Sequence, residues 1–193
     1  MSQAPRIIAF AGSTRSGSYN KKLVRIAATA ASKAGADVEV IDLKNYPLPL
    51  FDEDVEKEGG LPANAAQLKK LFIAADGFLL ASPEYNSSIS GVLKNTIDWI
   101  SRPVPGEAGL AGFMGKTAVL MSASPGGFGG LRGLVTVRSL LGNIGVTVLP
   151  DQVVVAKAHE AFNGDDTLKD AAQQASIEAL GTKLAGVLVK LKS

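Results

Sequence analysis

The segment Gly12–Asn20 reads Gly-Ser-Thr-Arg-Ser-Gly-Ser-Tyr-Asn and gathers hydroxyl groups around one arginine. It lies between an apolar run and a helical pattern, so backbone N–H groups and the positive end of a helix dipole would point at a ligand above it. Hydroxyl and guanidinium donors suit anionic oxygens, so the segment predicts a phosphate site. The alternative is a polar turn in which Ser18 or Asn20 caps the helix.

The type of phosphate ligand can be narrowed. Gly12 and Gly17 have the glycine spacing of a P-loop, but Ser18-Tyr19 stands where Lys-Ser/Thr belongs. Triphosphate hydrolysis is therefore not expected. The chain also lacks the G-x-G-x-x-G pattern that holds a dinucleotide pyrophosphate. A terminal monophosphate fits this loop better.

A second polar segment is Ser82–Ser90, Ser-Pro-Glu-Tyr-Asn-Ser-Ser-Ile-Ser. Tyr85 offers a flat apolar face, and Asn86 with the loop amides offers donors and acceptors. A heteroaromatic ring with carbonyl and imide edges needs both. The alternative is an ordinary turn in which Pro83 fixes the chain and Glu84 is solvated.

The third segment is Ser122–Gly130, Ser-Ala-Ser-Pro-Gly-Gly-Phe-Gly-Gly. Its glycines would let the backbone approach a ligand closely. The alternative is a flexible connection that geometry alone requires.

Residue types that carry much enzyme chemistry are absent or isolated. The chain has no cysteine and one histidine, His159, which is expected on the surface. Thiol catalysis, a Ser-His-Asp relay and a His-rich zinc site are therefore not expected. Asp52, Glu53 and Asp54 are read as a solvated loop rather than a cation site. We expect no metal and no catalytic side chain, so the chemistry would be carried by a cofactor.

Hydrophobic patterns predict the elements that position these segments. Strands are expected at Arg6–Ala11, Asp37–Leu43, Gly77–Ser82, Lys116–Ser122 and Thr147–Val155, the last with a break at Pro150 as an alternative. Helices are expected at 23–34, 63–75, 90–101, 131–144 and 167–191. The segments 44–62 and 102–115 are expected to be irregular. The last helix is expected to bury Leu168, Ala172, Ala175, Leu180, Leu184, Val187 and Leu191.

This alternation predicts an α/β flavodoxin-like three-layer sandwich, with a five-stranded parallel sheet of order 2-1-3-4-5 and helices on both faces. Residues 1–193 are expected to form a single domain. The three polar segments follow the first, third and fourth strands. Because carboxyl ends of parallel strands share one edge, the segments should meet there.

Composition sets further limits. The chain is 46% hydrophobic and 20% charged with a net charge of +2, which is ordinary for a globular protein. No basic stripe indicates nucleic-acid binding. No apolar run approaches membrane-spanning length, and the N-terminal run is too short for a signal peptide. We expect a cytoplasmic protein without nucleic-acid or membrane partners.

The segment Ser90–Arg102 is expected to form a helix with a wide apolar arc, made by Val92, Leu93, Thr96, Ile97, Trp99 and Ile100. An arc wider than one sheet contact predicts burial against a partner, hence a homodimer or homotetramer. The alternative is a helix packed deeply in its own domain.

Across these segments the chain resembles the NADPH-dependent FMN reductase family, the flavodoxin-like group that includes quinone, chromate and azo-dye reductases. The resemblance rests on Gly12–Asn20, on Pro83-Glu-Tyr-Asn86 and on Leu93-Lys-Asn-x-Ile-Asp-Trp99, and it spans about residues 6–150. It implies an FMN-dependent oxidoreductase that takes hydride from NADPH or NADH and passes electrons to small acceptors at the same site.

The resemblance also implies binding residues. FMN phosphate would be held by Ser13, Arg15, Ser18 and Asn20. The isoalloxazine and ribityl region would be lined by Pro83, Glu84, Tyr85 and Asn86. The other side would be closed by Ser122, Ser124, Gly126 and Gly127.

Other functions remain open from the sequence. An FMN-binding electron carrier would not accept hydride efficiently, and such carriers tend to be acidic, unlike this chain. A nucleotide-binding module would be colourless and would bind ATP or GTP with magnesium. A regulatory protein could keep only the fold.

Overall fold

The computed structural model describes residues 3–192. Parallel strands form one sheet in the order β2-β1-β3-β6-β7, with bounds Asp37–Ile41, Arg6–Ala11, Gly77–Ala81, Thr117–Ala123 and Thr147–Val155. Counted within the sheet, this is the order 2-1-3-4-5 of a flavodoxin-like fold, so the predicted fold class is confirmed. Every residue of β3 and β6 is buried, because helices cover both faces.

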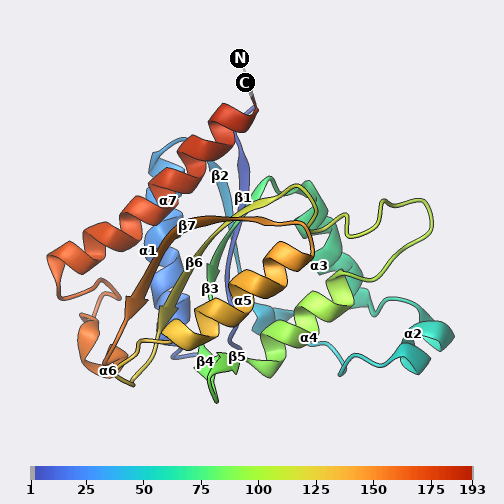
Figure 1. The fold of residues 1–193 in the computed structure, drawn as a ribbon, viewed down its shortest axis with the longest axis horizontal. Coiled ribbons are helices and arrows are strands. Elements are labelled where there is room, and N and C mark those ends of the chain that lie inside the picture. Colours follow the sequence, from blue (N-terminus) through green and yellow to red (C-terminus); the bar gives the residue numbers. More distant parts are fainter. Residues whose placement is uncertain (1–2, 193) are drawn as a thin grey trace.

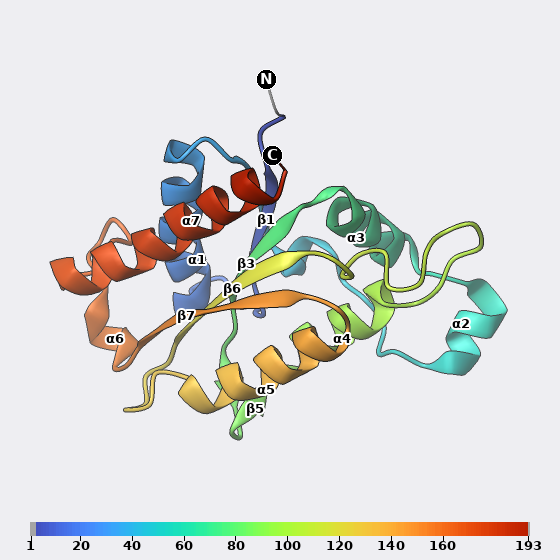
Figure 2. The ribbon, with the colours of Figure 1, turned by 45° about the horizontal axis from the view of Figure 1, so that its top comes forward.

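Helices α1 (Tyr19–Lys33) and α7 (Ala171–Leu191) cover one face of the sheet (Figure 1). Helices α3 (Ala63–Ala74), α4 (Gly91–Ile100) and α5 (Leu131–Asn143) cover the other. Successive strand residues point to opposite faces, so Leu79 and Phe78 belong to different buried clusters. Figure 2 shows the strands running between the two helix layers.

The segment after β2 is more ordered than expected. It holds a 3₁₀ turn, η1 (Leu43–Asn45), and a short helix, α2 (Glu53–Gly59). The Asp52 carboxylate caps α2 by accepting from the Asp54 amide at 2.8 Å. Acidic residues in the first turn of α2 interact favourably with the positive end of its helix dipole. The acidic patch therefore starts a helix that the expectation of an irregular connection missed.

The last helix begins at Ala171 rather than Thr167. The Asp170 carboxylate accepts hydrogen bonds from the amides of Ala172 and Gln173, at 2.8 and 3.1 Å, and so fixes the start. Leu168 is buried ahead of the helix.

The buried face of α7 is also partly different from the expected one. Leu180 and Leu184 are buried as predicted, but Ala172, Ala175 and Leu191 are exposed and Val187 is half-buried. The buried stripe consists of Ile177, Leu180, Gly181, Leu184, Ala185 and Leu188. A Cβ on Gly181 would lie 2.0 Å from the Ala27 carbonyl oxygen, so the backbones of α1 and α7 meet at this glycine. That close approach sets the rotation of the helix.

The apolar arc of α4 is buried within its own chain. Leu93, Thr96, Ile97 and Ile100 are buried, and Trp99 is fully buried with its indole N–H donating to the Pro49 carbonyl at 2.8 Å. On the outer side, Lys94 pairs with Asp98. The alternative of a deeply packed helix therefore accounts for the arc, and its width gives no reason for a partner.

Three smaller features refine the predicted elements. Strand β7 continues through Pro150, with a shift of register opposite β6 between Ala118 and Leu120. An edge strand tolerates a proline in this way. Within the segment expected to be a loop, β4 (Glu84–Tyr85) and β5 (Ser88–Ile89) form a small hairpin. A short helix, α6 (Ala158–Ala161), follows β7 and carries His159, whose side chain is half exposed, as expected.

Candidate functional site

The loops after β1, β3 and β6 meet at the carboxyl edge of the sheet, the lower edge in Figure 1. The Ser90 hydroxyl donates to the Gly12 carbonyl at 2.6 Å, which joins the second loop to the first. The Asn20 side chain donates to the Ala123 carbonyl at 2.8 Å and accepts from the Ala123 amide at 3.0 Å, which joins the first loop to the third. The expected convergence of the three loops is therefore present.

The first loop ends at the amino terminus of α1. Ser18 occupies the N-cap position, but its hydroxyl makes no capping hydrogen bond. Ser13 is nearly buried, and its hydroxyl accepts from the Arg15 amide at 3.3 Å. The Arg15 guanidinium carbon lies 5.1 Å from the centre of the Tyr19 ring. Hydroxyls, an exposed guanidinium and the positive end of a helix dipole are thus gathered at one point, and this donor set suits a phosphate.

Asn20 has a different place from the one expected. Its side chain is only 3% exposed, and both its oxygen and its nitrogen bond the backbone of Ala123. One amide hydrogen remains for any other partner. Asn20 therefore links the start of α1 to the end of β6 through these two hydrogen bonds.

The second loop presents the turn of the β4–β5 hairpin to solvent. Tyr85 is 59% exposed, and Asn86 and Ser87 have φ angles of 51° and 67°. Pro83 is buried beneath the turn, against Gly12 of the first loop. The Tyr85 ring and the Asn86 side chain, which could face a ligand, therefore lie on a turn that Pro83 supports from beneath.

Glu84 points away from this tip. Its side chain is 8% exposed, and its carboxylate accepts from the Gly133 amide at 3.1 Å and from Arg132 Nε at 2.9 Å. Burial by itself raises the pKa of Glu84, but the Gly133 and Arg132 hydrogen bonds outweigh it and hold the pKa below its ordinary value. The solvated glutamate of the alternative interpretation is wrong, because Glu84 ties the second loop to α5.

The third loop covers a buried hydroxyl. Ser122 is fully buried, and its Oγ has no hydrogen-bond partner within residues 3–192. Gly130 lies directly over it with φ at 93°, and a Cβ there would be 1.9 Å from Ser122 Oγ. Ser122 is therefore beneath the loop and cannot face a ligand unless Gly130 moves.

The remaining expected residues of the third loop are accessible. The Ser124 hydroxyl accepts from the Gly126 amide at 3.2 Å, and Gly126 and Gly127 are exposed. A Cβ on Gly127 would meet nothing within 4 Å, so the backbone there is open to a ligand.

Sequence reasoning missed three residues that shape this edge. Ser90 and Arg132 join loops, and Lys44 Nζ donates to the Ser16 hydroxyl of the first loop at 2.9 Å. Only Ser90 carried a local signal, since a serine before an apolar helical pattern is typical of an N-cap. The other contacts join residues far apart in the chain, so no spacing rule could reveal them.

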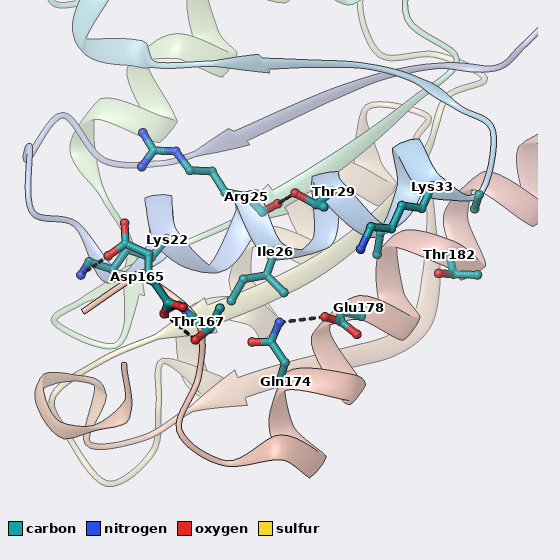
Figure 3. Close-up of a pocket in the computed structure, with 13 residues that line it drawn as sticks. Lys22, Arg25, Ile26, Thr29, Lys33, Asp165, Thr167, Gln174, Glu178 and Thr182 are labelled. Carbon is teal, nitrogen blue, oxygen red and sulfur yellow. Dashed lines mark hydrogen bonds and ion pairs between the residues drawn. The ribbon is translucent and has the colours of Figure 1, made fainter. Parts of the chain in front are cut away.

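A sizeable cavity lies elsewhere. It has a volume of about 660 Å³ and runs along α1 and α7 from Lys22 to Lys33 (Figure 3). Basic residues of α1 and acidic residues near α7 line it, and Lys22 pairs with Asp166. None of the residues expected to bind a ligand belongs to it. The candidate site is thus defined by converging loops rather than by this cavity.

Two negative findings concern residues 3–192 only. No helix in this range is long and apolar enough to cross a membrane. No group of three or more His, Cys, Asp or Glu side chains in the same range is placed to hold a metal ion.

Comparisons with known proteins point to one family. The family model described as NADPH-dependent FMN reductase matches residues 5–160. An NAD(P)H-dependent FMN reductase of Pseudomonas aeruginosa is 37% identical over 171 residues, which cover 88% of each chain. An NAD(P)H:quinone oxidoreductase of Solanum tuberosum is 34% identical over 192 residues, covering 97% of this chain and 94% of its own length.

Solved structures share the fold. A flavoenzyme NAD(P)H:(acceptor) oxidoreductase of Paracoccus denitrificans superimposes with a TM-score of 0.78, at 24% identity, over 97% of this chain and 98% of that one. An archaeal flavodoxin superimposes with a TM-score of 0.61 at 12% identity, over 95% of this chain and 99% of that one.

Proposed function

The chain belongs to the NADPH-dependent FMN reductase family, and from this premise we propose how its loops hold FMN and serve its reaction. It is an FMN-dependent NAD(P)H oxidoreductase. The observation that carries the placement of the cofactor is the convergence of three polar loops at the carboxyl edge beside the switch point between β1 and β3.

The phosphate of FMN is assigned to the first loop. Ser13, Ser18 and Arg15 supply hydroxyl and guanidinium donors at the amino terminus of α1. The exposed Arg15 guanidinium supports this assignment, because it is accessible to an anion. Ser18 is only 3% exposed, and its hydroxyl makes no capping hydrogen bond. Asn20 contributes mainly by fixing this helix end to β6.

The isoalloxazine is assigned to the space between the second and third loops. Tyr85 and Asn86 would form one side, supported from beneath by the buried Pro83, and Ser124, Gly126 and Gly127 would form the other. The resemblance placed Glu84 and Ser122 in the lining of the flavin site. Their side chains are buried under the loops, so they would instead support the loops from beneath. Residues 1–193 would form one FMN-binding domain.

When bound, FMN supplies the hydride acceptor and the electron donor of the two half-reactions. The chain's own groups bind and orient. Backbone amides of the glycine-rich loop and the Arg15 guanidinium are placed to stabilise negative charge. No side chain is needed as a nucleophile. The hydride donor and the electron acceptor would occupy the same face of the flavin in turn, which predicts ping-pong kinetics.

Quinones, free flavin, azo compounds and metal oxyanions are the proposed acceptors. Quinones come first because relatives in Solanum tuberosum and Escherichia coli are named quinone reductases. The alternative function is an FMN-binding electron carrier without efficient NAD(P)H oxidation. The slightly basic composition is against it.

A homodimer or homotetramer in the cytoplasm remains part of the proposal. Since α4 is covered by its own chain, an interface there would use its outer side, with Lys94 and Asp98, rather than the buried arc. Size-exclusion chromatography with light scattering measures the assembly directly.

The decisive experiment is an absorbance spectrum of the purified protein before and after NADPH is added without oxygen. We expect bound oxidised flavin, rapid bleaching by NADPH, and recovery of colour on adding a quinone. Bound flavin that NADPH bleaches only slowly would support the electron carrier. A colourless protein that does not bind added FMN would contradict both functions.

A further inference from the structure

Two cations reach the first loop without a carboxylate to balance them. Arg15 belongs to the loop, and Lys44 Nζ donates to the hydroxyl of the next residue, Ser16, at 2.9 Å. Within residues 3–192 neither Arg15 nor Lys44 forms an ion pair, whereas the nearby Lys21 pairs with Asp42 at 2.7 Å. Like charges brought to one loop repel each other. A bound anion would remove that cost.

Lys44 is delivered to the loop by a segment that is fixed along its length. We call Leu43–Phe51 the arm. At its start, Leu43 is buried, and the Asp42 carboxylate accepts from the Lys44 amide at 2.9 Å. In the middle, the Asn64 side chain donates to the Pro47 carbonyl at 2.9 Å.

The far end of the arm is held by α4. The Asn95 side chain and the Trp99 indole both donate to the Pro49 carbonyl, each at 2.8 Å. Asn95 also accepts from the Phe51 amide at 2.8 Å, and the Phe51 ring lies edge-on to Trp99 with 5.0 Å between centres. Asn95 and Trp99 are four residues apart, so they share one side of the helix.

These contacts give a role to the segment Leu93-Lys-Asn-x-Ile-Asp-Trp99, one of those on which the resemblance rests. Its Asn95 and Trp99 both hydrogen-bond to the arm, at Pro49 and Phe51. Leu93 of the motif lies directly against Gly12 of the first loop, whereas Asn95 and Trp99 reach the site through the arm, whose only charged side chain is Lys44.

We propose that Lys44 is the second cation of the phosphate site and makes the protein select flavin that carries a terminal phosphate monoester, with Asn95 and Trp99 as residues that position the arm. This inference rests on the proposed placement of the FMN phosphate at the first loop. A phosphate monoester carries about −1.5 to −2 charges at pH 7, more than one guanidinium balances. A lysine supplies the remainder as a compact point charge.

The test compares FMN with riboflavin, which is the same ring system without the phosphate. Dissociation constants are measured from quenching of flavin fluorescence on flavin-free protein. For Lys44→Gln we expect about tenfold weaker binding of FMN, with riboflavin binding unchanged. Lys44→Arg should restore most of the preference for FMN, because it restores the charge.

Two further variants complete the design. Lys70→Gln is the matched control, since Lys70 is exposed on α3 and makes no ion pair within residues 3–192; its FMN and riboflavin affinities should equal the wild-type values. Asn95→Ala should weaken FMN several-fold and riboflavin little. Thermal unfolding of each variant shows which of them fold normally.

The outcomes separate the two levels of the proposal. A wild-type protein that binds riboflavin as tightly as FMN would overturn the phosphate placement itself. A wild-type preference for FMN that survives fully in Lys44→Gln would overturn only the role of Lys44. Equal weakening of both flavins by Asn95→Ala, or no effect on either, would overturn the positioning role.

Discussion

Arg132 Nη2 lies 2.7 Å from Glu84 Oε1, and this ion pair joins the start of β4 in the second loop to the first turn of α5. The Gly133 amide donates to the same carboxylate, and the Arg132 guanidinium lies 5.1 Å from the centre of the Phe128 ring. The two loops assigned to the isoalloxazine are therefore held together by one buried carboxylate.

Glu84→Gln should destabilise the protein by about 1–2 kcal/mol at pH 7, since it removes a charge-assisted hydrogen bond. The pKa of Glu84 is lowered in the folded state. The contribution of ionised Glu84 to the free energy of unfolding is therefore complete above the ordinary glutamate pKa of about 4.3. It is lost as the pH falls through the lower pKa that Glu84 has in the folded state. Urea unfolding at pH 7 and at pH 3 measures this. The difference between wild type and variant should shrink in acid, and a difference independent of pH would show that the charge is not responsible.

Arg15→Ala should weaken FMN binding by about ten- to a hundredfold, because one charged donor to the phosphate is worth about 1.5–3 kcal/mol. The melting temperature of the flavin-free protein should barely change, since Arg15 is exposed. Arg25→Ala, which removes another exposed arginine of the same region, is the control. Full flavin occupancy and unchanged affinity in Arg15→Ala would contradict the phosphate assignment.

Gly130→Ala should unfold the third loop or destabilise the protein by more than about 2 kcal/mol, because the new Cβ would overlap Ser122 Oγ at a positive φ. Ser122→Ala should be neutral or slightly stabilising, since the buried hydroxyl has no partner within residues 3–192. The double variant should recover part of the loss. Chemical denaturation gives all three values, and a marked loss in Ser122→Ala alone would mean that this hydroxyl has a partner.

Gly181→Ala should separate α1 from α7 and cost about 1–3 kcal/mol by overpacking, since its Cβ would lie 2.0 Å from the Ala27 carbonyl oxygen. Gly186→Ala on the same helix is the matched control. Its Cβ would meet nothing within 4 Å, so the alanine should stabilise the helix by about 0.5–1 kcal/mol. Thermal unfolding of both variants checks this pair. Equal shifts of the same sign would rule out contact at Gly181 as the cause.

The order of the sheet and the meeting of the three loops were predictable from the sequence. Buried parallel strands are continuous apolar runs, and glycine and hydroxyl residues mark where each run ends. Once the strands are parallel, the loops after β1, β3 and β6 must share an edge. The residues Arg15, Tyr85 and Gly127 could be proposed as site residues for the same reason, since they lie in those loops and are exposed.

What the side chains contact there was decided by the tertiary structure. Asn20 bonds Ala123, Glu84 bonds Gly133, and Lys44 bonds Ser16, each across a long stretch of chain. Local patterns report which residues are polar, but they do not report which distant backbone amide or hydroxyl will lie within hydrogen-bond distance. The rotation of α7 about Gly181 shows the same limit. Helix packing there follows the closest backbone approach, which a count of apolar side chains cannot locate.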